Sequence, residues 1–179
     1  MATKQTLREF QSYLAQRLVA AQTSGKTASW LAVQAGQARL LLPLSHAGEI
    51  FSWSGVQRVP YARDWFLGVA NLRGGLFGVI DLGALLGGQP AGRHTESDLA
   101  QSRLLALNPV LETNSALLVD RLLGLRTMDS FAASNAPGAD APPYHGHVYT
   151  DADGSRWQEV NLQALSQHPV FLDIGAQSA

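Results

Sequence analysis

The side chain in this sequence that is best placed to recognise another molecule is Arg73. It lies in the run Asn71-Leu72-Arg73-Gly74-Gly75, between two apolar stretches rich in branched and aromatic residues. Asn and Gly tolerate positive φ, so we expect a tight turn here that displays Arg73 on a rigid corner. A guanidinium on such a turn can hold a carboxylate through two parallel hydrogen bonds, or donate to backbone carbonyls. The run therefore predicts a surface that another protein binds.

Asp81 and Asp120 are the carboxylates that could carry further chemistry. Each follows an apolar run, and we expect each to cap the turn or helix that comes next. Two alternatives stay open. Either carboxylate could hold Arg73 in an internal salt bridge, which would make that arginine structural. A hydrolase would instead need both carboxylates in one open cleft.

The remaining motifs predict no catalytic residue, no cofactor and no metal. The chain has no cysteine, so it has no thiolate metal site. His145 and His147 fall on one face of an expected strand without an apparent third ligand. The loop that begins at Asp151 lacks the glutamate that closes an EF-hand, so a hairpin turn is the better interpretation. A β-barrel that binds a small ligand stays as an alternative, and it would need an interior pocket.

The composition argues against nucleic acid and membrane as partners. The formal net charge is -1 and only 15% of residues are charged, which gives no electrostatic attraction to phosphate backbones or anionic lipid. No run approaches the roughly 20 apolar residues that span a bilayer. Charged residues near the N-terminus also interrupt any signal-peptide pattern. We expect a cytoplasmic protein without direct membrane insertion.

Residues 1–28 are expected to form an amphipathic extension to the domain. Apolar residues recur every three or four positions within 4–22, as one face of a helix requires; they are Leu7, Phe10, Leu14, Leu18 and Ala21. This helix could pack on its own chain or on a neighbouring molecule.

The rest of the chain reads as many short strands with glycine turns, which indicates an all-β barrel architecture. We expect strands at 30–35, 38–44, 49–53, 67–72, 76–82, 103–107, 116–119, 121–128, 144–150 and 156–160. A short helix is expected at 162–167, ending before Pro169. Residues 87–98 and 132–143 are expected to be an exposed connection and a long loop.

Several of these motifs together resemble the CheW-like domain family, bacterial chemosensory adaptors, from about residue 30 to 165. The motifs are Val59-Pro60, Trp65, Gly68-Val69, Asn71-Leu72-Arg73-Gly74, Val79-Ile80-Asp81-Leu82 and Leu118-Val119-Asp120 with Gly124. The resemblance implies two five-stranded, SH3-like β-barrel lobes around a shared core, here within residues 29–175, and it implies no catalysis.

The resemblance also implies two protein partners. One is a CheA-type histidine kinase, bound through its own CheW-like regulatory domain, and the other is the cytoplasmic tip of a chemoreceptor. The N-terminal helix and the Ala/Pro-rich loop look like the PilI type, which serves type IV pilus twitching motility. The residues expected at the partner interfaces are Glu49, Asn71, Arg73, Gly74, Leu76, Asp81, Val119 and Asp120.

Overall fold

The structure, a computed structural model, describes residues 29–87 and 94–176. The helix expected at 4–22 and part of the expected connection at 87–98 lie outside these residues. Within the described part of the chain, no helix is both long and apolar enough to cross a membrane.

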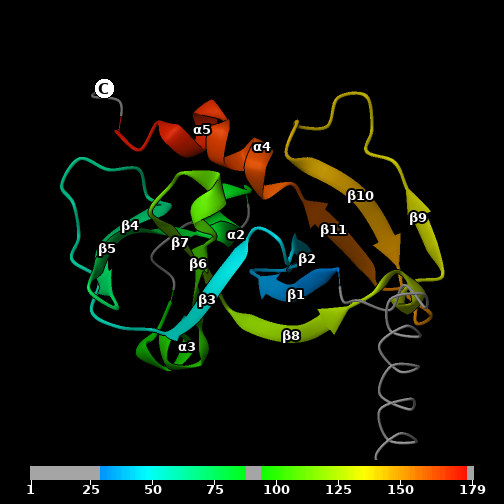
Figure 1. The fold of residues 1–179 in the computed structure, drawn as a ribbon, viewed down its shortest axis with the longest axis horizontal. Helices are drawn as coiled ribbons and strands as arrows, with labels where there is room; N and C mark the ends of the chain where they lie inside the picture. Colours follow the sequence, from blue (N-terminus) through cyan, green and yellow to red (C-terminus); the bar gives the residue numbers. More distant parts are fainter. Residues whose placement is uncertain (1–28, 88–93, 177–179) are drawn as a thin grey trace, which may run out of the picture.

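Two sheets form the body of the protein (Figure 1). The first has six strands in the order β8-β1-β2-β11-β10-β9. Their bounds are Arg121–Arg126, Trp30–Ala35, Ala38–Pro43, Arg156–Val160, His145–Thr150 and Ala133–Asn135. The second has five strands in the order β3-β6-β7-β5-β4. Their bounds are Ala47–Ser52, Arg103–Leu107, Ser115–Val119, Gly75–Asp81 and Phe66–Leu72.

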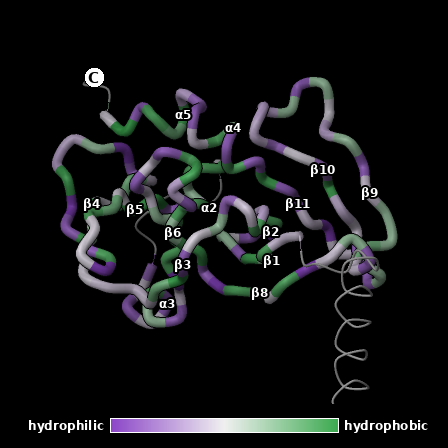
Figure 2. The backbone as a smooth tube through the Cα atoms, in the orientation of Figure 1, coloured by the Kyte–Doolittle hydropathy of each residue, from purple (hydrophilic) through white to green (hydrophobic). Residues whose placement is uncertain are grey.

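A shared hydrophobic core joins the two sheets. It combines buried side chains of both sheets with side chains of the short C-terminal helices; among them are Leu31, Leu42, Ile80, Leu105, Leu117 and Leu165. Each sheet also has a smaller cluster on its other face, around Leu104 and Leu118 in the five-stranded sheet and around Trp30 and Trp157 in the six-stranded sheet. Figure 2 shows the hydrophobic residues concentrated on strands such as β1 and β8. The expected shared core is confirmed.

The five-stranded sheet curls so that its two edges meet. After β3, one edge strand, the chain turns and Gln57 pairs with Val69 of β4, the other edge strand. Two backbone hydrogen bonds, from the N–H of each residue to the carbonyl of the other, hold this contact. Gly68 has φ +137°, and a Cβ there would overlap the Gln57 carbonyl. The close approach of two backbones therefore requires glycine.

The all-β prediction and the strand positions are confirmed, with one correction to the strand count. The region 132–143, expected to be a loop, contains β9, which pairs with β10 and brings that sheet to six strands rather than five. The Ala-Ser-Asn sequence of β9 gives no hydrophobic alternation, and all three residues are exposed. Backbone hydrogen bonding to β10, and not side-chain burial, makes this strand.

Two of the short helices differ from expectation. Helix α3, Glu96–Gln101, lies within the expected connection, and a reciprocal capping box between Thr95 and Asp98 starts it. Helix α5, Pro169–Leu172, begins at the proline that was expected only to end α4, because proline suits the first turn of a helix. Helix α4, Leu162–Gln167, has the expected bounds. The remaining helix, α2, spans Leu82–Leu85, and single 3-10 turns lie at Pro109–Leu111 and Met128–Ser130.

Candidate functional site

The corner between β4 and β5 is a two-residue hairpin turn. Leu72 pairs with Gly75 across it, and the residues between them, Arg73 and Gly74, both have positive φ, +48° and +81°. That pattern belongs to a type I′ turn, whose twist matches the twist of the flanking strands. The Asn71 side-chain oxygen accepts a hydrogen bond from the Gly74 N–H at 2.8 Å. Asn71 and Gly74 therefore shape the turn, as the sequence predicted.

Arg73 pays a conformational penalty at this position. Type I′ turns favour Asn or Gly where φ is positive, and a left-handed conformation costs an ordinary L-residue about 1–2 kcal/mol. Strained residues of this kind cluster at binding and active sites, where the side chain is needed for something other than folding. The side chain is 76% exposed, so packing of this side chain does not offset the backbone strain.

Arg73 forms a salt bridge with Glu49. The guanidinium Nη2 lies 2.7 Å from Glu49 Oε1, and the Glu49 side chain is 43% exposed. The expectation of an internal salt bridge to Asp81 or Asp120 is wrong, because the pair is exposed and joins the hairpin corner to the edge strand β3. Exposed ion pairs contribute about 0–1 kcal/mol to stability. Both charges therefore remain available to a partner at little cost.

An exposed leucine completes this surface. Leu76 lies opposite Asn71 in the β4–β5 register and is 63% exposed. The corner thus joins an acidic, a basic and an apolar side chain, of which the acidic one comes from the opposite edge strand β3 and the other two from the hairpin. Five of the eight expected interface residues meet there: Glu49, Asn71, Arg73, Gly74 and Leu76. We call these five residues the corner.

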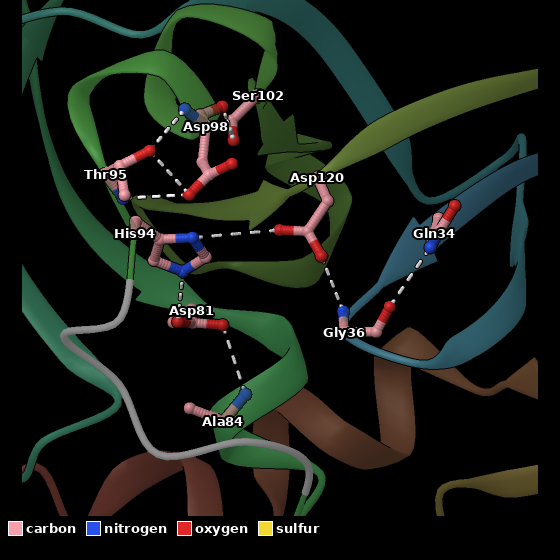
Figure 3. Close-up of polar contacts among 9 residues, drawn as sticks. All are labelled: Gln34, Gly36, Asp81, Ala84, His94, Thr95, Asp98, Ser102 and Asp120. Carbon is pink, nitrogen blue, oxygen red and sulfur yellow. Dashed lines mark hydrogen bonds and ion pairs between the residues drawn. The ribbon is translucent and has the colours of Figure 1, made fainter.

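Asp81 and Asp120 lie at a different place, where β5 and β7 end. Asp81 Oδ1 accepts a hydrogen bond from the Ala84 N–H and so caps α2, as predicted. Asp120 does not cap the segment after it, which corrects that prediction. Its Oδ2 instead accepts from the Gly36 N–H at 2.6 Å, in the turn between β1 and β2 (Figure 3). Asp120 therefore ties the end of one sheet to a turn of the other.

His94 joins the two carboxylates. Its Nε2 lies 2.8 Å from Asp81 Oδ2, and its Nδ1 lies 3.9 Å from Asp120 Oδ1, as Figure 3 shows. No sequence motif considered above includes His94. The capping box that follows it, Thr95 to Asp98, was the available signal, since it fixes where α3 starts and hence where His94 lies. The Thr95 hydrogen bonds hold the pKa of Asp98 below its ordinary value.

A polar cavity of about 370 Å³ opens beside these residues. It lies between the β1–β2 turn, the start of α2, and α3, and its lining includes Asp81, His94, Asp98 and Asp120. Hydrogen bonds to Ala84, His94 and Gly36 already engage three of the four oxygens of Asp81 and Asp120. This arrangement favours a structural role over a hydrolytic one. Binding of a small ligand in this cavity stays a prediction.

Among the expected interface residues Asp81 is buried, at 6% exposure, and Val119 is a second one that lies inside the fold. Its side chain has 0% exposure and packs in the shared core, so it does not reach a partner. A branched residue in a strand is usually core, and Val119 follows that rule.

The two histidines of β10 have no metal-binding geometry. Among the described residues, no group of three His, Asp or Glu side chains is arranged to hold a metal ion. His147 Nδ1 lies 3.9 Å from Glu159 Oε2, and partial burial lowers the pKa of His145.

Comparison with known proteins gives three findings. The model of the CheW-like domain family matches residues 29–170. The chain is 29% identical over 166 residues to protein PilI of Pseudomonas aeruginosa, covering 90% of this chain and 88% of the relative. Its fold is similar to the crystal structure of scaffolding protein TtCheW from Thermoanaerobacter tengcongensis, with a TM-score of 0.58 at 17% identity over 75% of this chain and 89% of that one. At that identity, the structural likeness speaks for the fold alone.

Proposed function

The chain belongs to the CheW-like domain family, and from this premise we propose that it is a non-enzymatic adaptor between a CheA-type histidine kinase and a chemoreceptor of the methyl-accepting type. Its similarity to PilI supports a place in a chemosensory system that controls type IV pilus twitching motility. In this proposal residues 29–175 form the adaptor domain and residues 1–28 form an extension. The protein works in the cytoplasm and is recruited to membrane-associated arrays.

The observation that carries the proposal is the corner. Its arginine is held in a strained backbone conformation, is exposed, and makes a surface ion pair. A side chain that contributes so little to stability is best explained by recognition. We propose that the helical receptor tip binds here, with Arg73 donating to its carboxylates or backbone carbonyls and Leu76 covering apolar surface.

The kinase binds elsewhere in this proposal. One lobe pairs end to end with the CheW-like regulatory domain of the kinase. Each contact is small, with about 1,200 Å² or less buried in total, as in other reversible signalling contacts. Many weak contacts in one array then give strong overall association. A change in the receptor tip alters how the adaptor holds the kinase.

Charge reversal at the corner tests the receptor contact. We expect Arg73→Glu to weaken capture of the co-encoded receptor tip by about tenfold or more, because it removes charge-assisted hydrogen bonds. The free energy of unfolding should change by no more than about 1 kcal/mol, since the ion pair is exposed. Calorimetric binding and urea denaturation measure the two quantities. The matched control is Arg156→Glu, which makes the same charge change at an exposed position of β11.

A charge swap separates recognition from structure. The double variant Glu49→Arg with Arg73→Glu can rebuild the salt bridge with its polarity reversed. If Arg73 binds the receptor tip directly, the swap restores the free energy of unfolding but not receptor binding. Recovery of receptor binding by the swap would show that the ion pair serves the fold only, and the proposed receptor contact would then be wrong. Capture of the isolated kinase regulatory domain should survive all of these changes.

A further inference from the structure

The strand β8 leaves part of the shared core uncovered. Its partner β1 presents Leu31 and Val33 to that core, where both are buried. In the register of the two strands, Leu125 lies opposite Leu31 and Leu122 opposite Val33. Residues paired in this way lie on the same face of the sheet. Leu122 and Leu125 therefore extend the core-facing surface by one strand.

A bulge at Gly124 produces this arrangement. The register shifts between Ala32 and Val33, and Gly124 has φ +94°. The extra residue places Leu122 and Leu125 on one face although they are three apart, while Leu123 packs on the opposite face with the Trp30 cluster. Two leucines are thereby directed to one side of the sheet edge.

The described part of the chain leaves these leucines partly exposed. Leu125 is 57% exposed and Leu122 is 36% exposed, and Met128, just beyond the strand, is 57% exposed. Strand β8 is also an edge of its sheet, and an exposed apolar edge is a surface that normally has an occupant. We call Leu122, Leu125 and Met128 the β8 edge patch.

The N-terminal segment enters the fold beside this patch. Ser29, the first described residue, donates its backbone N–H to the carbonyl of Arg126 at 2.9 Å. Residues 1–28 are thus tethered next to Arg126, at the end of β8. In the sequence, Arg126 lies between Leu125 and Met128. A tethered segment has an effective concentration in the millimolar range for a nearby surface, which favours it over a second molecule in solution.

We propose that residues 1–28 cover the β8 edge patch with the apolar stripe that runs from Leu7 to Ala21. As a helix, this stripe is about 21 Å long. Strand β8, from Arg121 to Arg126, spans about 17 Å, so a helix of this length can lie along the whole strand. Residues 22–28 provide up to about 23 Å of connecting chain, enough for the helix to turn back along the strand.

In this proposal, burial of apolar side chains, and not ion pairing, holds the two surfaces together. The segment carries Lys4, Arg8, Arg17 and Lys26 against Glu9, and the patch is flanked by Arg121 and Arg126. Asp120 and Asp129 also adjoin the patch and balance Arg121 and Arg126, so the patch offers the mainly basic segment no net opposite charge and ion pairing is not the main attraction. Burial of the stripe against the patch is the main attraction, and salt should not weaken it.

Amide hydrogen exchange on the full-length chain tests the proposal. The double variant Leu14→Asp with Leu18→Asp places two charges in the stripe and should speed exchange of the outward-facing β8 amides by about tenfold. The matched control, Ser12→Asp with Gln16→Asp, places the same charges on the opposite face of the helix and should leave exchange unchanged. The amides of Tyr149 and Trp157, in strands away from β8, serve as an internal check that the fold is intact.

A variant on the receiving side completes the test. Leu125→Asp should speed exchange of the amides in residues 7–21, whereas Leu172→Asp, at another exposed leucine, should not. Equal exchange at β8 in the parent and the stripe variant overturns the proposal. Protection at β8 that disappears on dilution, together with a dimer in light scattering, also overturns it and assigns the patch to a second copy of the chain.

Discussion

At the residue level, Arg73 combines a demanding backbone position with a side chain that the fold does not need. The turn conformation suits asparagine or glycine, while the salt bridge to Glu49 is exposed and weak by its nature. Stability and recognition therefore favour different residues at this one position. That conflict supports the proposal that Arg73 is a binding residue.

Replacing Arg73 by asparagine should separate the two effects. Asparagine adopts positive φ at a lower free-energy cost than arginine, and loss of the ion pair costs about 0–1 kcal/mol. We expect Arg73→Asn to leave the free energy of unfolding within about 1 kcal/mol of the parent, on the more stable side, while receptor binding falls. Urea denaturation measures the first quantity. A loss of stability well above 1 kcal/mol would show that the Arg73–Glu49 pair supports the fold.

At the level of elements, glycine at one position of β4 lets the five-stranded sheet close. Gly68 lies where the backbone of β4 meets the chain after β3, and no side chain fits between them. The closure brings the β3 edge and the β4–β5 corner to the same place, which is why Glu49 reaches Arg73. The geometry of the candidate site therefore depends on a residue that does not belong to it.

Gly68→Ala should be strongly destabilising. A Cβ at this position meets the Gln57 carbonyl, and φ +137° is unfavourable for alanine, so we expect a loss of about 3 kcal/mol or more. The Val69 amide, which donates to the Gln57 carbonyl, should lose its protection from exchange. The matched control is Gly138→Ala, where a Cβ has open space and the change should stay within about 0.5 kcal/mol. Equal stability of the two variants would contradict a role for Gly68 in closure.

At the level of the whole molecule, the two sheets share one core and should unfold together. Side chains from both sheets and from the C-terminal helices pack in the same cluster. Asp120, at the end of β7, adds polar contacts between the same two sheets. Its side chain accepts from the Gly36 N–H in the β1–β2 turn, and its own N–H donates to the Gln34 carbonyl of β1. Under the proposed function, such rigidity would allow movement at one partner contact to be transmitted to the other.

Leu105→Ala tests this coupling. Leu105 lies in β6, is fully buried and belongs to the shared core, so the cavity should cost about 3 kcal/mol. Amides of both sheets, for example Val79 and Tyr149, should lose the same amount of protection in hydrogen exchange. As a control, Leu172→Ala at an exposed site should change stability by less than about 0.5 kcal/mol. Reduced protection in the five-stranded sheet alone would mean that the two lobes unfold independently.

Local patterns were enough to locate most elements. Alternating apolar residues and glycine turns placed the strands, Pro169 limited α4, and Asn71 with Gly74 marked the hairpin turn. These features depend on neighbours within a few residues, so they can be read along the chain. Three elements differ from prediction. Strand β9 depends on backbone pairing with β10, and α5 starts at a proline that was expected only to end a helix. Helix α3 begins with a capping box, Thr95 to Asp98, which was a local signal.

The amino-acid sequence by itself determined the all-β character, the turn that displays Arg73 and the capping role of Asp81, because these follow from side-chain alternation and local backbone preference. Only the tertiary structure decided that Arg73 pairs with Glu49, that Val119 is buried, that His94 lies between Asp81 and Asp120, and that β8 leaves leucines uncovered. Each of these depends on which strands become neighbours, including the parallel pairs of β5 with β7 and β2 with β11. Such contacts join residues far apart in the sequence, and their energies exist only after the chain has closed on itself.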